Sequence, residues 1–118
     1  MRKQIKEAIA CHALWKQRLL HSIETGKSEF APDQICCDSN CDFGRWLYGG
    51  SIPEAAKRSP HYETCRNLHA EFHREAANIL RLALNGQTEQ AIASLGLRGK
   101  YVELSSNLVI AMMAWMDA

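Results

Sequence analysis

Three histidines and one cysteine, each set in an otherwise apolar stretch, have the greatest capacity for chemistry in this 118-residue chain. His69 and His73 are four residues apart in a helical pattern, so their side chains share one helix face, about 5–6 Å apart. His12 lies near the start of the chain, and Cys41 stands between the two regions. An imidazole pair at this spacing can bind one metal ion, and a third imidazole and a thiolate complete the tetrahedron that Zn²⁺ takes. Zinc is therefore the cofactor we expect.

The alternative for these histidines is separate burial, each with its own hydrogen bond to a carbonyl group or to water. His12 falls in the middle of the apolar stripe of its helix, and His69 and His73 flank the stripe that contains Phe72. All three imidazoles should therefore point into the core, where an unpartnered polar group is destabilising. Separate burial explains one such histidine well, but three of them beside a cysteine favour a shared metal ion.

The two remaining histidines do not fit this site. His21 is nine residues from His12, which turns it to the opposite side of the same helix. His61 precedes His69 by two turns, about 12 Å along the helix axis. We expect both to lie on the surface.

The other cysteines offer one rival arrangement. Cys36 and Cys37 could form a thiolate cluster with Cys41, but adjacent cysteines rarely both fit one tetrahedron, and no second pair follows. Cys11 and Cys65 are expected to be small core residues.

Composition narrows the class of protein. The net charge is +1, from 14 basic and 13 acidic residues, which gives no electrostatic signature for nucleic acid. No apolar run reaches 18 residues, so we expect no membrane insertion. Five cysteines at irregular spacing, without a signal peptide, predict reduced thiols and a cytoplasmic location.

The apolar periodicity predicts one domain over residues 1–118. Its fold class is all-α, an antiparallel four-helix bundle with an additional short helix that carries the cysteine. The expected helices span 2–24, 41–48, 52–59, 60–85, 88–95 and 98–116. Residues 26–40 are expected to be a connection, with Ser39 or Asn40 capping the short helix.

Aromatic and acidic residues beside the four donors have expected supporting roles. Four aromatic side chains are expected to wall the site from water while packing the core: Trp15, Phe43, Trp46 and Phe72. Glu71 and Asp42 are candidates, by proximity in sequence, for orienting the imidazoles.

The last helix has more apolar surface than one core-facing side requires. Its apolar residues are spread around the helix: Val109, Ile110, Met112, Met113 and Met116. We expect a second buried side, provided by a homodimer, although burial all round a central helix would also explain the pattern.

Three motifs together resemble the bacterial chemoreceptor zinc-binding (CZB) domain family. They are His12-Ala-Leu-Trp15, Cys41-Asp-Phe-Gly-Arg-Trp46 and His69-Ala-Glu-Phe-His73. The resemblance implies a helical bundle that holds Zn²⁺ through His12, Cys41, His69 and His73, usually as a homodimer. Members of the family occur on chemoreceptors and diguanylate cyclases, where they report zinc availability or oxidation of the zinc-bound cysteine, for example by hypochlorous acid.

The sequence contains no methyl-accepting coiled coil and no GGDEF-type catalytic domain. The chain is therefore either a stand-alone sensor that acts through another protein or a domain of a longer one, and Met1 favours the first.

A site filled by four protein ligands leaves no position for a reactive water, so we do not expect an enzyme. It can still signal, because zinc would keep Cys41 as the thiolate that oxidants attack. Oxidation of Cys41 would weaken its bond to zinc, and Cys36 or Cys37 could then form a disulfide with it.

Three other functions compete with a sensor. A di-iron bundle of the hemerythrin type needs more inward histidines and carboxylates than the helices offer. A Cys41–histidine nucleophile would need an oxyanion hole that the sequence does not indicate. A permanent zinc staple in an interaction module has the same sequence signature as a reversible sensor, and only zinc affinity separates the two.

Overall fold

The computed structural model describes residues 2–28, 30–36, 41–96 and 99–117. For Cys36 it describes the backbone but not the side chain. Every regular element in these ranges is a helix. The helices are α1 (Arg2–Thr25), α2 (Pro32–Cys36), α3 (Asp42–Tyr48), α4 (Glu54–Lys57), α5 (Pro60–Leu84), α6 (Thr88–Leu95) and α7 (Lys100–Asp117).

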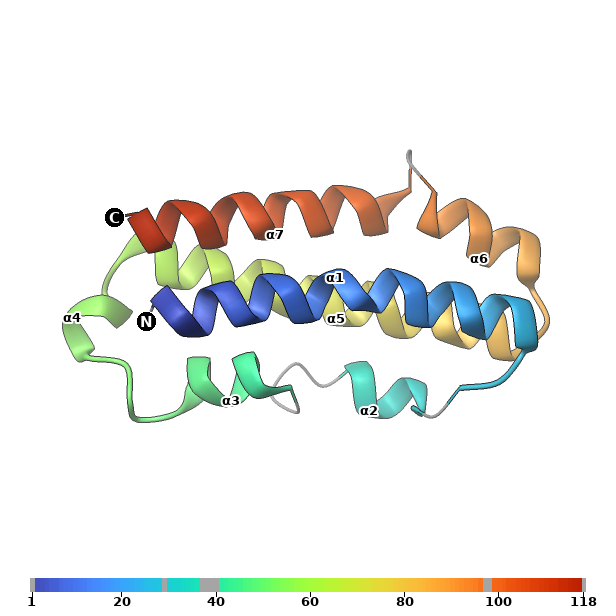
Figure 1. Ribbon diagram of the computed structural model, residues 1–118, viewed down its shortest axis with the longest axis horizontal. Coiled ribbons are helices and arrows are strands. Elements are labelled where there is room, and N and C mark those ends of the chain that lie inside the picture. Colours follow the sequence, from blue (N-terminus) through green and yellow to red (C-terminus); the bar gives the residue numbers. More distant parts are fainter. Residues whose placement is uncertain (1, 29, 37–40, 97–98, 118) are drawn as a thin grey trace.

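Four rods make up the bundle (Figure 1). Two rods are the long helices α1 and α5, which run in the same direction. The other two rods run the opposite way, and each consists of two helices in line: α2 with α3, and α6 with α7. Both termini therefore lie at one end. This confirms the predicted all-α antiparallel bundle with a short helix next to the cysteine.

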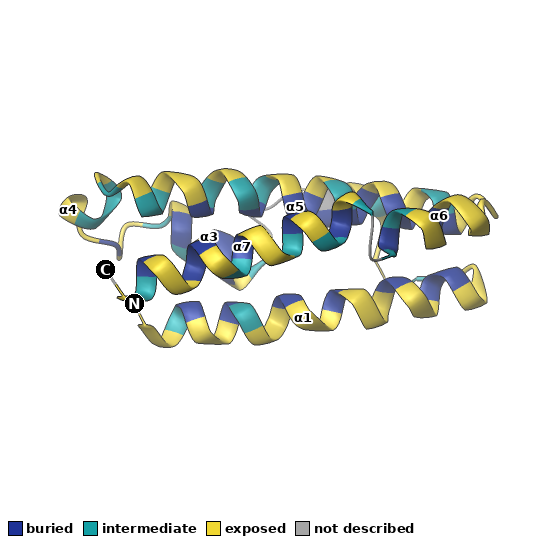
Figure 2. Cartoon of the chain, turned by 90° about the horizontal axis from the view of Figure 1, so that it is seen from above, coloured by how far each residue is buried: buried dark blue, intermediate teal, exposed yellow. Residues whose placement is uncertain are grey.

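The long helices form because their apolar residues recur at the helical period. In α1 the buried residues follow a three- and four-residue spacing that includes Ile5, Ala8, His12, Trp15 and Leu19. Figure 2 shows the buried positions of α1 on the side that faces the other helices. The histidine thus occupies a core position in a helix whose other core positions are mostly apolar.

Local signals set the ends of these helices. The Ser59 hydroxyl accepts a hydrogen bond from the His61 amide at the start of α5, and Pro60 takes the first helical position. Gly26 and Gly86 follow α1 and α5 with φ of 71° and 76°, which glycine adopts without strain. Both helices end within one residue of the expected positions, 24 and 85.

Cys41 itself caps α3. Its Sγ accepts a hydrogen bond from the Gly44 amide at 3.3 Å, and its backbone is extended, with φ −87° and ψ 159°. The predicted caps Ser39 and Asn40 lie outside the described residues. The helix begins one residue later than expected, because Cys41 takes the capping position.

The prediction that residues 26–40 form only a connection was wrong, because α2 lies within it. Pro32 takes the first helical position, and the Gln34 side chain accepts a hydrogen bond from the Ala31 amide. Ile35 is buried at 4% exposure, and Asp33 forms an exposed ion pair with Arg81 of α5. These contacts hold five residues in a helix that has little stability by itself.

Helix α7 is apolar on two sides, as its composition predicted. Met112 and Trp115 are buried, whereas Ile110 and Met113 are 65% and 48% exposed. Neither α7 nor any other helix of the described ranges combines the length and the hydropathy that crossing a membrane requires.

Candidate metal centre

The structure brings together four donor atoms from distant parts of the chain. The donors of His12, Cys41, His69 and His73 all lie within 4.8 Å of one another. The Nε2 atom of His69 is at the centre of the group, 3.1 Å from the Nε2 atoms of His12 and His73 and 3.2 Å from Cys41 Sγ. The three imidazoles are buried and the cysteine is half-buried.

Three rods of the bundle contribute to this cluster. His12 comes from the middle of α1, and Cys41 from the N-terminal cap of α3. His69 and His73 are one turn apart on the buried face of α5. A single ion bound here would therefore connect α1, α3 and α5.

Backbone carbonyl groups fix the orientation of two imidazoles. His12 Nδ1 donates to the Ala8 carbonyl at 2.7 Å, and His73 Nδ1 donates to the Ile35 carbonyl of α2 at 2.9 Å. A carbonyl oxygen only accepts, so in each neutral ring the proton is on Nδ1 and the Nε2 lone pair points into the cluster.

The contacts among these donors are more favourable with a bound cation than without one. His12 and His73 both direct a lone pair at His69 Nε2, which carries at most one proton and can donate it to only one of them. The other contact brings two lone pairs face to face, a repulsion that a bound cation would remove. Tetrahedral zinc with Zn–N bonds of about 2.0–2.1 Å places its nitrogen ligands about 3.3–3.4 Å apart, near the 3.1 Å that separates His69 Nε2 from each of the other two imidazole nitrogens.

Burial also keeps the imidazoles in the neutral form that binds metal. Loss of solvation lowers the pKa of His12 to about 4, although its bond to Ala8 partly opposes this. Loss of solvation, with repulsion from His73 and His12, lowers the pKa of His69 to about 2. Neutral imidazole nitrogens and a cysteine sulfur are the donors that Zn²⁺ prefers.

The expected acidic partners of the imidazoles were wrong. Glu71 and Asp42 are both exposed, and Asp42 pairs with Arg45 at 2.9 Å on the surface. The carbonyl groups of Ala8 and Ile35 take the role that these carboxylates were expected to have. Because a carbonyl is neutral, it orients each ring without adding charge to the buried site.

Three of the four expected wall residues contact the imidazoles, and the fourth packs behind one of them. Phe72 and Phe43 are closest, with ring centres 5.3 Å from His12 and 5.1 Å from His69, respectively. Trp15 is 6.5 Å from His73. Trp46 packs against Phe43 at 5.6 Å and so forms an outer layer. Phe30, which the sequence analysis missed, covers Trp15 at 5.4 Å.

Among the remaining histidines and cysteines, two predictions need correction, the surface position of His61 and the core position of Cys11. His21 is exposed as expected, but His61 is half-buried near the start of α5. Cys65 is a buried core residue, and burial raises the pKa of its thiol to about 11. Cys11 was expected in the core and is exposed, because it lies one position from the buried stripe of α1. Cys37 lies outside the described residues.

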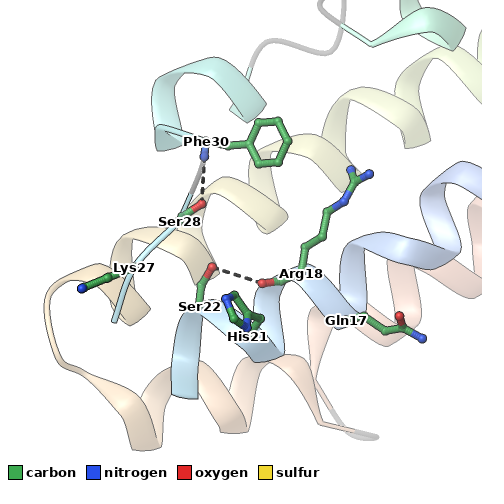
Figure 3. Close-up of a pocket in the computed structure, with 7 residues that line it drawn as sticks. All are labelled: Gln17, Arg18, His21, Ser22, Lys27, Ser28 and Phe30. Atoms are coloured by element: carbon green, nitrogen blue, oxygen red, sulfur yellow. Dashed lines mark hydrogen bonds between the residues drawn. The ribbon is translucent and has the colours of Figure 1, made fainter. Parts of the chain in front are cut away.

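A surface pocket of about 520 Å³, which none of the four donors lines, lies where α1 meets the chain that follows it (Figure 3). Its basic side chains do not converge: Lys27 points away, while the Arg18 guanidinium extends toward Phe30 and lies 4.9 Å from the Trp15 ring centre. The pocket therefore has no clustered charge for an anion. Arg18 instead packs against the aromatic pair beside the metal centre.

A helical bundle with a cluster of three buried imidazoles and one half-buried thiol has the donor set of a metal-binding α-helical domain. The family model of the chemoreceptor zinc-binding domain (CZB) matches residues 12–80, which is more than half of the chain and includes all four donors. The chain belongs to this family and is a zinc-binding domain. Neither the curated proteins nor the solved structures include a significant match.

The lowered histidine pKa values predict how stability depends on pH. Between pH 6.5 and about 4 the unfolded chain takes up protons at His12 and His69 that the folded chain does not. The free energy of unfolding of the metal-free protein should therefore fall with falling pH, by up to about 1.4 kcal/mol per pH unit for each such proton. Urea unfolding at pH 7 and pH 5 measures this, and His12→Gln should reduce the slope. Equal slopes in the wild type and His12→Gln would contradict the assignment.

Proposed function

We propose that His12, Cys41, His69 and His73 together bind one Zn²⁺ ion, and that this domain regulates a signalling partner according to zinc supply or to oxidation of Cys41. The convergence of four donors within 4.8 Å carries the proposal. Four protein ligands leave no open position for substrate or water, which favours a regulatory role over a catalytic one.

The position of Cys41 supports a redox response. Its sulfur is the only thiol in the donor set, and it also caps α3 through the Gly44 amide. Zinc would hold this sulfur as the thiolate, the form that oxidants attack. Oxidation would thus weaken a metal bond and a helix cap together, and a chemical change at one atom would alter the packing of α3.

A permanent zinc staple is the competing function, and a competition titration separates the two. Zinc affinity is measured against a calibrated chelator before and after treatment with hypochlorous acid. The proposal predicts one zinc per chain in the reduced protein and a loss of zinc affinity of more than about 100-fold after oxidation. Removing the hydrogen-bond partner of a metal ligand lowers affinity by about 10–100-fold, and losing the ligand itself should lower it further. Unchanged affinity at oxidant doses that modify Cys41, or a site that never exchanges zinc, would instead support a staple.

For the assembly, we propose a homodimer that covers the exposed apolar side of α7, where Ile110 and Met113 lie. The family suggests a chemoreceptor or a diguanylate cyclase as the signalling partner, in the cytoplasm. A chain that sediments as a monomer at micromolar concentration would contradict the dimer.

A further inference from the structure

Two surface openings beside the metal centre are lined by Cys41. The first, of about 170 Å³, lies between α1 and α3 and is lined by residues that include Glu7, Ala8 and Trp46. The second, of about 410 Å³, lies beside α2 and is lined by residues that include Trp15, Phe30 and Ile35. Each opening also contains one of the buried imidazoles, His12 in the first and His73 in the second.

Three residues line both openings: Cys11, Cys41 and Asp42. On α1, the first opening is lined at positions 4, 7, 8, 11 and 12 and the second at 11, 15 and 18, so Cys11 stands where the two meet. Cys41 and Asp42 line both openings from the start of α3. The two cysteines therefore border the same two openings, Cys11 from α1 and Cys41 from the cap of α3.

Access favours reaction between these two sulfurs. Cys11 is exposed, and it adjoins His12, whose donor nitrogen lies within 4.8 Å of Cys41 Sγ. Cys65 is fully buried on α5, and burial raises the pKa of its thiol, so it is a poor nucleophile. Among the cysteine side chains that the structure describes, Cys11 is the exposed thiol that lines the same two openings as Cys41.

We propose that Cys11 is the resolving cysteine of the site, forming a disulfide with Cys41 after Cys41 is oxidised. The proposal rests on the redox role proposed above and adds the residue that makes the oxidation reversible. It is an alternative to Cys36 and Cys37, which the sequence suggested from proximity and whose side chains lie outside the part of the chain that the structure describes.

The chemistry needs one two-electron oxidant, such as hypochlorous acid. The Cys41 thiolate loses two electrons and gains the hydroxyl oxygen to become a sulfenic acid, while chloride leaves. The Cys11 thiolate then attacks the Cys41 sulfur, the S–O bond breaks, and the departing hydroxide takes a proton to leave as water. The new bond connects α1 to α3, and a dithiol reductant restores both thiols.

Mass spectrometry of the zinc-loaded protein tests this bridge. After a near-stoichiometric dose of hypochlorous acid, free thiols are blocked and the chain is digested with trypsin without reduction. We expect peptide 7–16, which contains Cys11, to be linked to peptide 28–45, which contains Cys41. Because the second peptide also carries Cys36 and Cys37, the same link must form in a Cys36→Ser/Cys37→Ser variant.

Cys11→Ser provides the functional readout. Since Cys11 is exposed and is not a donor, the variant should bind zinc as the wild type does and release it at the same oxidant dose. Zinc rebinding after dithiothreitol should be complete in the wild type and in Cys36→Ser/Cys37→Ser. In Cys11→Ser it should be largely lost when at least two equivalents of hypochlorous acid per chain are used, because the second equivalent oxidises the unprotected Cys41 sulfenic acid to the sulfinic acid, which dithiothreitol does not reduce.

Two results would overturn the bridge. A disulfide from Cys41 to Cys36 or Cys37 without the 7–16 link, or full zinc recovery in Cys11→Ser, would leave the redox function intact and remove Cys11 from it. If the oxidant neither modifies Cys41 nor releases zinc, the redox function itself fails and the bridge fails with it.

Discussion

Replacing His69 with alanine is expected to remove zinc from the purified protein almost completely. His69 Nε2 is the one donor within 3.2 Å of the other three, so its loss opens the centre of the site. Loss of a hydrogen-bond partner of a ligand lowers metal affinity by about 10–100-fold, and loss of the ligand itself should exceed that range. The measurement is zinc per chain by elemental analysis, together with a competition titration.

His21→Ala is the matched control for this substitution. His21 is an exposed histidine on α1 and contributes no donor, so the variant should retain one zinc per chain with unchanged affinity. Because His69→Ala also leaves a cavity in the core, circular dichroism must show that the variant remains helical. A helical His69→Ala protein that binds zinc as tightly as the wild type would contradict the assigned ligand set.

Removing zinc from the wild-type protein is expected to loosen the helices that share the site while the bundle persists. With free zinc about 1,000-fold above its dissociation constant, binding stabilises the folded state by about 4 kcal/mol. For a domain of this size, that corresponds to a fall in Tm on the order of 10 °C or more on chelation. The large apolar core, which includes Phe72, Leu80, Met112 and Trp115, should keep the metal-free chain folded.

Hydrogen–deuterium exchange shows where the loosening occurs. The amides of α3 should exchange faster after chelation, because Cys41 is both a donor and the cap of that helix. Those of α2 should follow, because the Ile35 carbonyl is bonded to His73. Helix α6 carries none of the four donors and serves as the internal control. Uniform acceleration, or none, would contradict local coupling between the metal and these helices.

Much of the fold, and the convergence of the four candidate donors, could be predicted from the sequence. The stripe through Ile5, Trp15 and Leu19 gave the inward face of α1, and the same periodicity put His12 on that face. The four-residue spacing of His69 and His73 predicted a shared face of α5. These predictions succeeded because helical periodicity is a local property of the chain.

The features that sequence analysis missed depend on tertiary contacts. Helix α2 has only five residues, and burial of Ile35 stabilises it more than local propensity does. The Ile35 carbonyl could not be predicted as the partner of His73, since the two residues are 38 positions apart. The Ala8 carbonyl could have been predicted, because a helical side chain can reach the carbonyl group four residues earlier. The exposure of Cys11 could also have been predicted, because the residue lies one position from the buried stripe of α1.

X-ray absorption spectroscopy at the zinc edge tests the central claim most directly. If the four side chains bind one ion, the spectrum of the zinc-loaded protein should show three nitrogen ligands at about 2.0–2.1 Å and one sulfur ligand at about 2.3 Å. In Cys41→Ser the sulfur contribution should disappear. A wild-type shell without sulfur, or an oxygen-rich shell of higher coordination number, would contradict a site made by His12, Cys41, His69 and His73.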